Sequence, residues 1–186
     1  LTILNLRRNN LHGTIPHTWT SGNKLRMIDV GDNKLRGQVP KSIVNCMLLE
    51  NLDLGNNQIN DSFPFWLATL PELKILILRS NYFHGPIAAP EFSLVFPKLR
   101  IFDISCNSIT GSLPSKFFQS WNAMKIVDDG QLGYMQVKTF VFQMGSLGHF
   151  SDHYDYSMIM TNKHLKTKYY KIIEGLEIID FSHNLK

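Results

Sequence analysis

The chain has little of what usually marks an enzyme, a disulfide-stapled domain or a membrane span. Its 186 residues include only two cysteines, 18% of them are charged, and no apolar run approaches the length of about 20 residues that spans a bilayer. It contains no G-x-S-x-G nucleophile elbow and no glycine-rich phosphate loop. We therefore expect no catalytic residues and no cofactor.

The charge pattern is also uninformative about a polyanionic partner. Nineteen basic and fifteen acidic residues give a formal net charge of +4, and the two signs are interspersed. A nucleic-acid-binding protein would be expected to gather its basic residues into a stripe or patch. We expect a mixed, solvated surface and no nucleic-acid partner.

What the sequence does contain is a repeated pattern of leucines and an asparagine. The clearest copy is residues 49–64, LENLDLGNNQINDSFP. Successive copies start 24, 24, 24, 26 and 77 residues apart, and a fixed period of this size predicts a leucine-rich-repeat solenoid. The copies begin at Leu1, Leu25, Leu49, Leu73, Leu99 and Leu176, and their asparagines are Asn9, Asn33, Asn57, Asn81, Asn107 and Asn184.

The apolar residues at the first, fourth and sixth positions of each copy predict a short strand over positions three to eight. One copy has too little chain to bury these leucines, so neighbouring copies must stack and pair their strands. We predict an α/β repeat fold with a parallel β-sheet on the concave side and short 3-10 or irregular segments on the convex side. The asparagine amides should form a ladder that satisfies backbone groups of adjacent turns.

A glycine follows the asparagine in four copies, at Gly13, Gly37, Gly85 and Gly111, where a tight bend is expected. The third copy has Asp61 instead. Because aspartate tolerates the left-handed conformation better than most residues, we predict a variant of the same bend there.

These motifs resemble a known subtype. The first sixteen residues, LTILNLRRNNLHGTIP, fit LxxLxLxxNxLxGxIP, which resembles the plant extracellular leucine-rich repeat. The resemblance implies receptor ectodomains or secreted inhibitors, with a second short strand near the G-x-I-P segment.

The leucine pattern lapses between Met124 and Leu176, a stretch with five of the seven methionines and five of the six tyrosines. We divide the chain into five repeats at 1–122, a non-repeat island at 123–175 and the start of a truncated sixth repeat at 176–186. Residues 121–124, 134–135, 156–157 with Lys163, and 171–173 leading into 179–182 resemble the island of plant leucine-rich-repeat receptor-like proteins, which include disease-resistance receptors. The sequence departs from that family's pattern at two places: His164 stands where the family commonly carries a glycine after the lysine, and Leu185 follows Asn184 directly.

The outward strand positions should form columns that a ligand could contact. Asp29, Asp53, Asp103 and Asp180 match what the subtype carries there, so we take them as structural. Residues that break the columns, together with island tyrosines, are better binding candidates, although at least half of the aromatics should serve to pack the island. The candidates are Arg7, Arg8, Ile75, Ile77, Arg79, Ile101, Tyr134, Tyr154 and Tyr156.

The sequence contains one candidate glycosylation site. Asn60 begins the sequon Asn-Asp-Ser on a predicted surface bend and is a candidate for glycosylation. Cys46 and Cys106 lie three strands apart, about 14 Å, which predicts two free thiols, Cys46 buried and Cys106 at the edge of the concave face. We predict a solvated loop, and not a metal site, for the segment that contains His149, Asp152, His153 and Asp155. Nearby glycines disfavour the helix that would align the two histidines.

The resemblance implies a function in recognition and not in catalysis. The expected protein is the extracellular part of a plant receptor-like protein that binds a peptide or protein ligand and recruits a co-receptor or adaptor receptor kinase, in defence or development. It would be a single-pass type I protein on the extracellular side of the plasma membrane, with its span outside these residues. The alternatives are the ectodomain of a receptor kinase and a secreted inhibitor of pathogen wall-degrading enzymes.

Overall fold

The computed structural model describes residues 1–87, 96–112, 118, 121–125, 133–138, 142–143, 149–150, 153–162 and 165–184. The chain forms two compact units. The first comprises Leu1–Ile126 and Glu177–Lys186, and the second comprises Val127–Leu176. The second unit falls in the stretch where the leucine pattern lapses.

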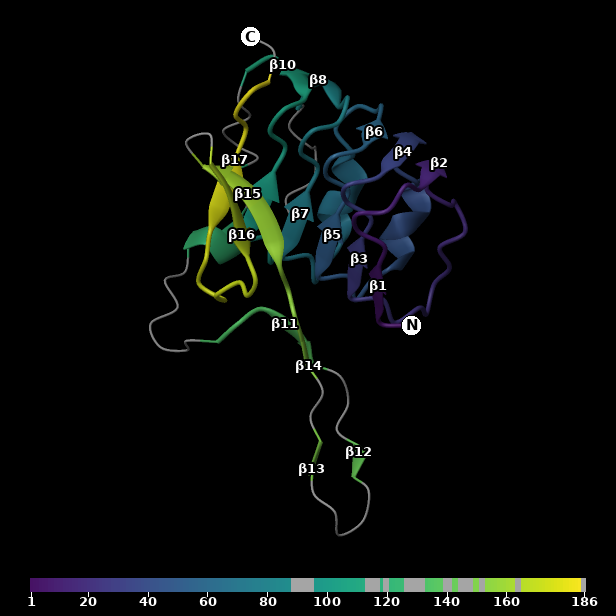
Figure 1. Ribbon diagram of the computed structural model, residues 1–186, viewed down its shortest axis with the longest axis vertical. Helices are drawn as coiled ribbons and strands as arrows, with labels where there is room; N and C mark the ends of the chain where they lie inside the picture. The colour runs from purple at the N-terminus through teal and green to yellow at the C-terminus, as the bar shows by residue number, and fades with distance from the viewer. Residues whose placement is uncertain are drawn as a thin grey trace. The chain divides into compact units, whose positions relative to one another are not determined.

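The first unit is built on a parallel sheet of six three-residue strands in the order β1-β3-β5-β7-β9-β17 (Figure 1). The Cα partners are the equivalent positions of successive repeats, such as Ile3 with Met27 and Ile101 with Ile178. This register confirms the predicted solenoid and shows that the sixth strand follows directly on the fifth in space. The strands are β1 (Ile3–Asn5), β3 (Met27–Asp29), β5 (Asn51–Asp53), β7 (Ile75–Ile77), β9 (Ile101–Asp103) and β17 (Ile178–Asp180).

A second series of short strands follows the asparagines of the first five repeats, as the resemblance implied, and its members pair in parallel. Gly37 shows why glycine is needed at the bend: its φ is +82°, and a Cβ there would lie 3.0 Å from Cγ2 of Thr14. These strands are β2 (His12–Gly13), β4 (Lys34–Gly37), β6 (Gln58–Ile59), β8 (His84–Pro86) and β10 (Ser108–Thr110).

The prediction for Asp61 was wrong in its mechanism. Asp61 is not among the residues with positive φ. Its carboxylate instead accepts hydrogen bonds from the backbone N–H of Val39, at 3.1 Å, and of Ser62, at 2.9 Å. The side chain therefore replaces glycine's backbone freedom with a hydrogen bond to the preceding repeat, as Asp readily does in turns.

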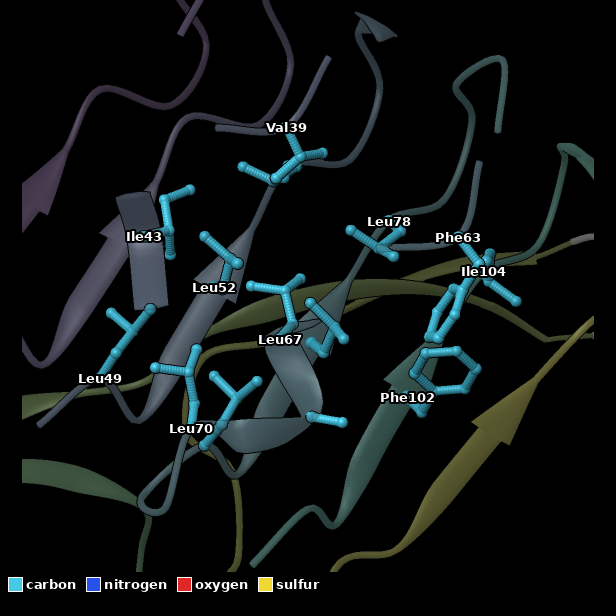
Figure 2. Packing of buried hydrophobic residues seen from close by; sticks show 14 of the residues in the cluster. Val39, Ile43, Leu49, Leu52, Phe63, Leu67, Leu70, Leu78, Phe102 and Ile104 are labelled. Carbon is cyan, nitrogen blue, oxygen red and sulfur yellow. The ribbon is translucent and has the colours of Figure 1, made fainter. Parts of the chain in front are cut away.

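On the side opposite the sheet, the described residues include three 3-10 helices, as predicted: η1 (Lys41–Asn45), η2 (Phe65–Thr69) and η3 (Asn122–Lys125). Pro40 and Pro64 precede the first two and fix the chain direction. Figure 2 shows Leu67 of η2 among Leu52, Leu70 and Leu78, all of them inaccessible to solvent. The core between sheet and 3-10 helices is thus continuous along the repeats.

The asparagine ladder is present and regular. The amide nitrogen of Asn57 donates to the carbonyls of Val30 in the previous repeat and Leu54 in its own, at 3.1 and 3.0 Å. Its side-chain oxygen accepts from the backbone N–H of Leu35 at 3.0 Å. Asn33, Asn81, Asn107 and Asn184 make the equivalent bonds.

Aromatic rings fill the first unit where the sixth repeat joins the fifth. Trp121 is buried and contacts Phe102 edge-on at 5.3 Å and Phe118 at 5.0 Å between ring centroids. Phe118 in turn lies 5.7 Å from Phe181. This cluster joins residues from before and after the interruption, so the chain resumes the same core when it returns.

The second unit consists of short antiparallel pairs. Its longest element is the hairpin of β15 and β16, in which Ile159 lies opposite Lys168 and Met158 opposite Tyr169. Met135, Val137, Tyr156, Met158 and Ile172 are buried. The strands are β11 (Gln136–Lys138), β12 (Phe142–Gln143), β13 (His149–Phe150), β14 (His153–Asp155), β15 (Met158–Asn162) and β16 (Leu165–Tyr169).

Candidate recognition surfaces

An ionic cluster lies at the first strands, on the face of the sheet that carries the outward strand positions. The Arg7 guanidinium binds Asp53, two strands away, through Nη1; the same nitrogen lies 3.4 Å from Asp29, and Nη2 lies 2.9 Å from Asp32. Gly31 leaves room for this arrangement, since a Cβ there would lie 3.1 Å from Arg7 Nη1. Arg7 was a binding candidate because it broke the column pattern, but its charge is matched within the chain.

Burial shapes the titration of this cluster. Burial, together with the neighbouring Asp53 charge, raises the pKa of Asp29 to about 6, and Arg7 only partly opposes the shift. Burial also raises the pKa of Asp53. Burial lowers the pKa of Arg7, but the carboxylates of Asp53, Asp29 and Asp32 raise it more, so Arg7 stays protonated.

A second arginine lies on the same face, further along the sheet. Nη1 of the buried Arg79 is 3.9 Å from Asp103, whose pKa is raised by burial. Ser105 donates its hydroxyl to Asp103 at 2.6 Å. Gly55 again provides space, because a Cβ there would lie 3.0 Å from Cγ of Arg79. Arg7 and Arg79 are thus accommodated in the same way: a glycine just beyond the neighbouring strand leaves room for an arginine side chain whose guanidinium lies near aspartate.

Four predicted contact residues are not accessible. Ile75, Ile77, Ile101 and Arg79 were expected to face solvent, and all four are buried, Ile77 with 3% of its surface exposed. The expectation considered one strand at a time, whereas side chains of adjacent parallel strands, about 4.8 Å apart, pack against each other along a column. Ile77 Cγ2, for example, lies 3.2 Å from where a Gly55 Cβ would be.

Arg8 is the accessible candidate of the first unit. Its side chain is 62% exposed, and its Nε lies 3.5 Å from Asp32. Arg8 occupies the eighth position of its repeat, where the backbone is left-handed in all six copies. The residues are Arg8, Asp32, Asn56, Ser80, Cys106 and His183, with φ between 52° and 57°.

We call these six positions the left-handed rim. Sequence reasoning missed the rim, because Arg8, Ser80 and Cys106 do not belong to the residue types that favour φ > 0. The available signal was position alone: each residue directly precedes a ladder asparagine, where the chain leaves the strand.

The three tyrosine candidates of the second unit differ in exposure. Tyr156 is buried, so it is not available for contact. Tyr154 is half-buried in β14. Tyr134 is 45% exposed, and the Lys171 ammonium lies 5.3 Å from its ring centroid. Of the three, Tyr134 remains the accessible candidate.

The remaining predicted sites are placed as follows. Asn60 is exposed at the end of β6. Both cysteines are free; Cys46 is buried, which raises the pKa of its thiol, and Cys106 is exposed. Asp152 lies outside the described residues, and Asp155 forms an ion pair with Lys171 at 2.9 Å.

The described part of the chain lacks two further features. It contains no group of three or more histidine, cysteine, aspartate or glutamate residues placed to hold a metal ion. Among the same residues, no helix has the length and apolar character that a membrane crossing needs.

An apolar hollow of about 370 Å³ lies within the first two repeats. Leu4, Leu6, Trp19 and Val30 contribute to its lining. These residues occupy the positions that in later repeats fill the core, and we therefore assign the hollow to the solenoid interior and not to a ligand site.

The stacked strands, the ladder and the bends define the class: this is a leucine-rich-repeat solenoid. Comparison with known families agrees, since the family described as "Leucine rich repeat" matches residues 1–59 and again residues 98–120. Receptor-like protein 34 and Receptor-like protein 35 of Arabidopsis thaliana are 43% and 42% identical over 185 residues, 99% of this chain. The chain belongs to the plant leucine-rich-repeat receptor-like proteins. It spans 18% of the length of each of these two relatives.

Solved structures of plant receptors share the fold. The crystal structure of PEPR1–AtPEP1 matches with a TM-score of 0.60 at 30% identity, covering 66% of this chain and 17% of that one. The Arabidopsis receptor kinase HAESA, in complex with the peptide hormone IDA and the co-receptor SERK1, matches with a TM-score of 0.57 at 26% identity, covering 66% and 20%. The HAESA match shows that this fold occurs in a plant receptor kinase that has been crystallised with a peptide hormone and a co-receptor.

Proposed function

We propose that this chain is the extracellular recognition module of a plant cell-surface receptor-like protein, which binds a peptide or protein ligand and recruits a co-receptor or adaptor receptor kinase. The single observation that carries the proposal is the similarity to receptor-like proteins over 185 residues, because it includes the non-repeat segment as well as the repeats. The type I orientation and the role in defence or development belong to the same proposal.

The geometry supports recognition by a preorganised surface. The hydrogen-bonded ladder and the shared core hold successive repeats in one register. A rigid surface loses little conformational entropy on binding. The accessible candidates are Arg8 in the first unit and Tyr134 in the second, whereas Arg7 and Arg79 serve internal ion pairs. Tyr and Arg are residue types that are enriched at the energetic centres of protein interfaces.

Receptor kinases provide the second candidate function. Their ectodomains share the fold at 26–30% identity in the two structures described above, which is lower than the identity with receptor-like proteins. A secreted inhibitor of wall-degrading enzymes is the third candidate, and the similarity of the non-repeat segment to receptor-like proteins weighs against it. Sequencing the gene beyond Lys186 discriminates the three. A membrane span followed by a short tail would indicate a receptor-like protein, a span followed by a kinase domain would indicate a receptor kinase, and no span would indicate a secreted inhibitor.

Ligand-dependent association with a co-receptor tests the proposal. The protein is immobilised, SERK1 ectodomain is added, and peptide fractions from plant extracellular fluid are screened for association by interferometry. We expect at least one fraction to induce the complex, and Arg8→Glu to weaken it while Arg36→Glu, an equal change at an exposed arginine of β4, does not. Failure of every fraction with SERK1 and with a panel of other receptor kinase ectodomains would overturn the proposal.

A further inference from the structure

The second unit exposes a compact set of aromatic and basic side chains, which we call the lysine–tyrosine patch: Tyr134, Lys168, Tyr170, Lys171 and Ile173. Tyr170 is 71% exposed and Ile173 49%. Tyr134 and Ile173 are paired in an isolated antiparallel bridge, so the patch includes two segments that are far apart in sequence. Large apolar groups that remain exposed together mark candidate interaction surfaces.

Two lysines of this patch, Lys168 and Lys171, belong to the most basic segment of the sequence. Residues 163–171, KHLKTKYYK, contain four of the nineteen basic residues and none of the fifteen acidic ones. The rest of the chain therefore carries fifteen basic and fifteen acidic residues, so the formal net charge of +4 comes entirely from these nine positions. The interspersed charges expected from the sequence describe the remainder of the chain but not this segment.

The two lysines of the patch are held over aromatic rings. Lys168 Nζ lies 4.3 Å from the ring centroid of Tyr170, and Lys171 Nζ lies 5.3 Å from that of Tyr134. Lys171 also pairs with Asp155 at 2.9 Å, which raises the pKa of Lys171. Within the described residues Lys168 has no carboxylate within ion-pair distance. A ring contact orients an ammonium group without neutralising it.

We propose that the lysine–tyrosine patch binds an extended acidic segment of a partner protein. This inference rests on the proposed function, because it takes the partner to be a protein. Carboxylates of the segment would complement Lys168, and its apolar side chains would cover Tyr170 and Ile173. A mixed surface of this kind fits a peptide, because aromatic residues are enriched at protein interfaces, whereas recognition of anionic lipids relies on denser clusters of basic residues than the two lysines of the patch.

The test uses a fluorescent peptide of alternating glutamate and leucine as the probe, with its lysine counterpart as the control ligand. Anisotropy titrations against the whole protein should show binding of the acidic probe only, weakened by high salt. Lys168→Glu should weaken binding roughly fivefold or more, and Tyr170→Ser roughly twofold to fivefold. Lys34→Glu, the same charge change at an exposed lysine of β4, should leave affinity unchanged. Thermal unfolding verifies that each variant is folded.

Three outcomes would overturn the proposal: equal affinity of the wild type and Lys168→Glu, stronger binding of polygalacturonate with no effect of Tyr170→Ser, or a preference for anionic lipid vesicles. The SERK1 association assay keeps this result separate from the proposed function. Loss of peptide-induced association in a protein that still binds the acidic probe argues against the receptor role. If the protein does not bind the acidic probe but still associates with SERK1 when peptide is added, the result argues against the lysine–tyrosine patch and leaves the receptor role unaffected.

Discussion

The side-chain amide of Asn184 donates a hydrogen bond to the carbonyl oxygen of Ile104 at 3.1 Å, across 80 residues of sequence. Asn184 also accepts from the backbone N–H of Ile109 at 3.1 Å. These are the same bonds that neighbouring repeats make across 22 to 29 residues. The hydrogen bonds of the ladder therefore connect the fifth and sixth repeats in the way that they connect consecutive repeats. Asn184 makes these bonds although Leu185 follows it directly in the sequence.

Asn81→Ala should be strongly destabilising. Its amide bonds the carbonyls of Leu54 and Leu78, and its oxygen accepts from Ile59, all in a buried setting. Leaving such groups unsatisfied costs about 1–3 kcal/mol each, so we expect a loss of about 3 kcal/mol or more in urea unfolding. Asn9→Ala is the control: Asn9 is exposed, and its loss should cost less than about 1 kcal/mol. Similar losses at both sites would contradict the role of the ladder.

Ser80→Gly should stabilise the protein. Ser80 has φ of 52°, a conformation that costs a non-glycine residue roughly 1 kcal/mol. We expect a gain of up to about 1 kcal/mol, seen as a higher Tm. Ser108→Gly in β10 is the matched substitution in an extended strand and should lower stability by about 0.5–1 kcal/mol. A loss of stability at both serines would show that the left-handed rim carries no strain.

Ile77→Asp should destabilise the fold itself. Ile77 is buried in β7, so the change removes apolar contact and buries a carboxylate. We expect a loss of roughly 3 kcal/mol or more in the free energy of unfolding. Asn5→Asp introduces the same residue at the exposed position of that column in β1 and should change stability little. Unchanged stability of Ile77→Asp would restore Ile77 as a candidate for ligand contact.

The Arg7 cluster should make stability depend on pH. The native pKa of Asp29, about 6, exceeds the ordinary value of 3.8, so the native state binds this proton more tightly than the unfolded state does. The resulting stabilisation is fully present below pH 3.8 and is lost as pH rises through 6, by roughly 2–3 kcal/mol. Asp29→Asn should flatten this slope in urea unfolding between pH 4 and 7, whereas Glu72→Gln at a more exposed carboxylate should not. An unaltered slope in Asp29→Asn would assign it to other groups.

Asn60 should carry an N-linked glycan when the protein is secreted from plant cells. Asn60 and Ser62 of the sequon are both exposed, so an oligosaccharide meets no buried neighbour. Mass spectrometry before and after glycosidase treatment should show one glycan, which is lost in Ser62→Ala and kept in Ser62→Thr. A protein without glycan in both the wild type and Ser62→Thr would exclude this site.

The candidate site was less predictable from the sequence than the fold. Arg7, Ile77 and Arg79 stood out because they break the columns of the repeat, and this reasoning located unusual residues correctly. It could not show that Arg7 and Arg79 neutralise aspartates of adjacent strands, or that Ile77 is buried. These properties depend on neighbours 22 to 46 residues away, and a single repeat contains no information on their side-chain packing.

The sequence alone determined the repeat, because the spacing of leucines and asparagines follows from what a short strand and a ladder require. The strand register and the positions of the bends therefore agreed with the structure from Leu1 to Asn107, whereas the outward positions Ile75, Ile77 and Ile101 are buried. Only the tertiary structure decided which polar groups face one another: the carboxylate of Asp61 on Val39, the left-handed rim, and the lysines held over Tyr134 and Tyr170. Periodicity fixes backbone position, whereas side-chain partners depend on contacts that the local sequence does not encode.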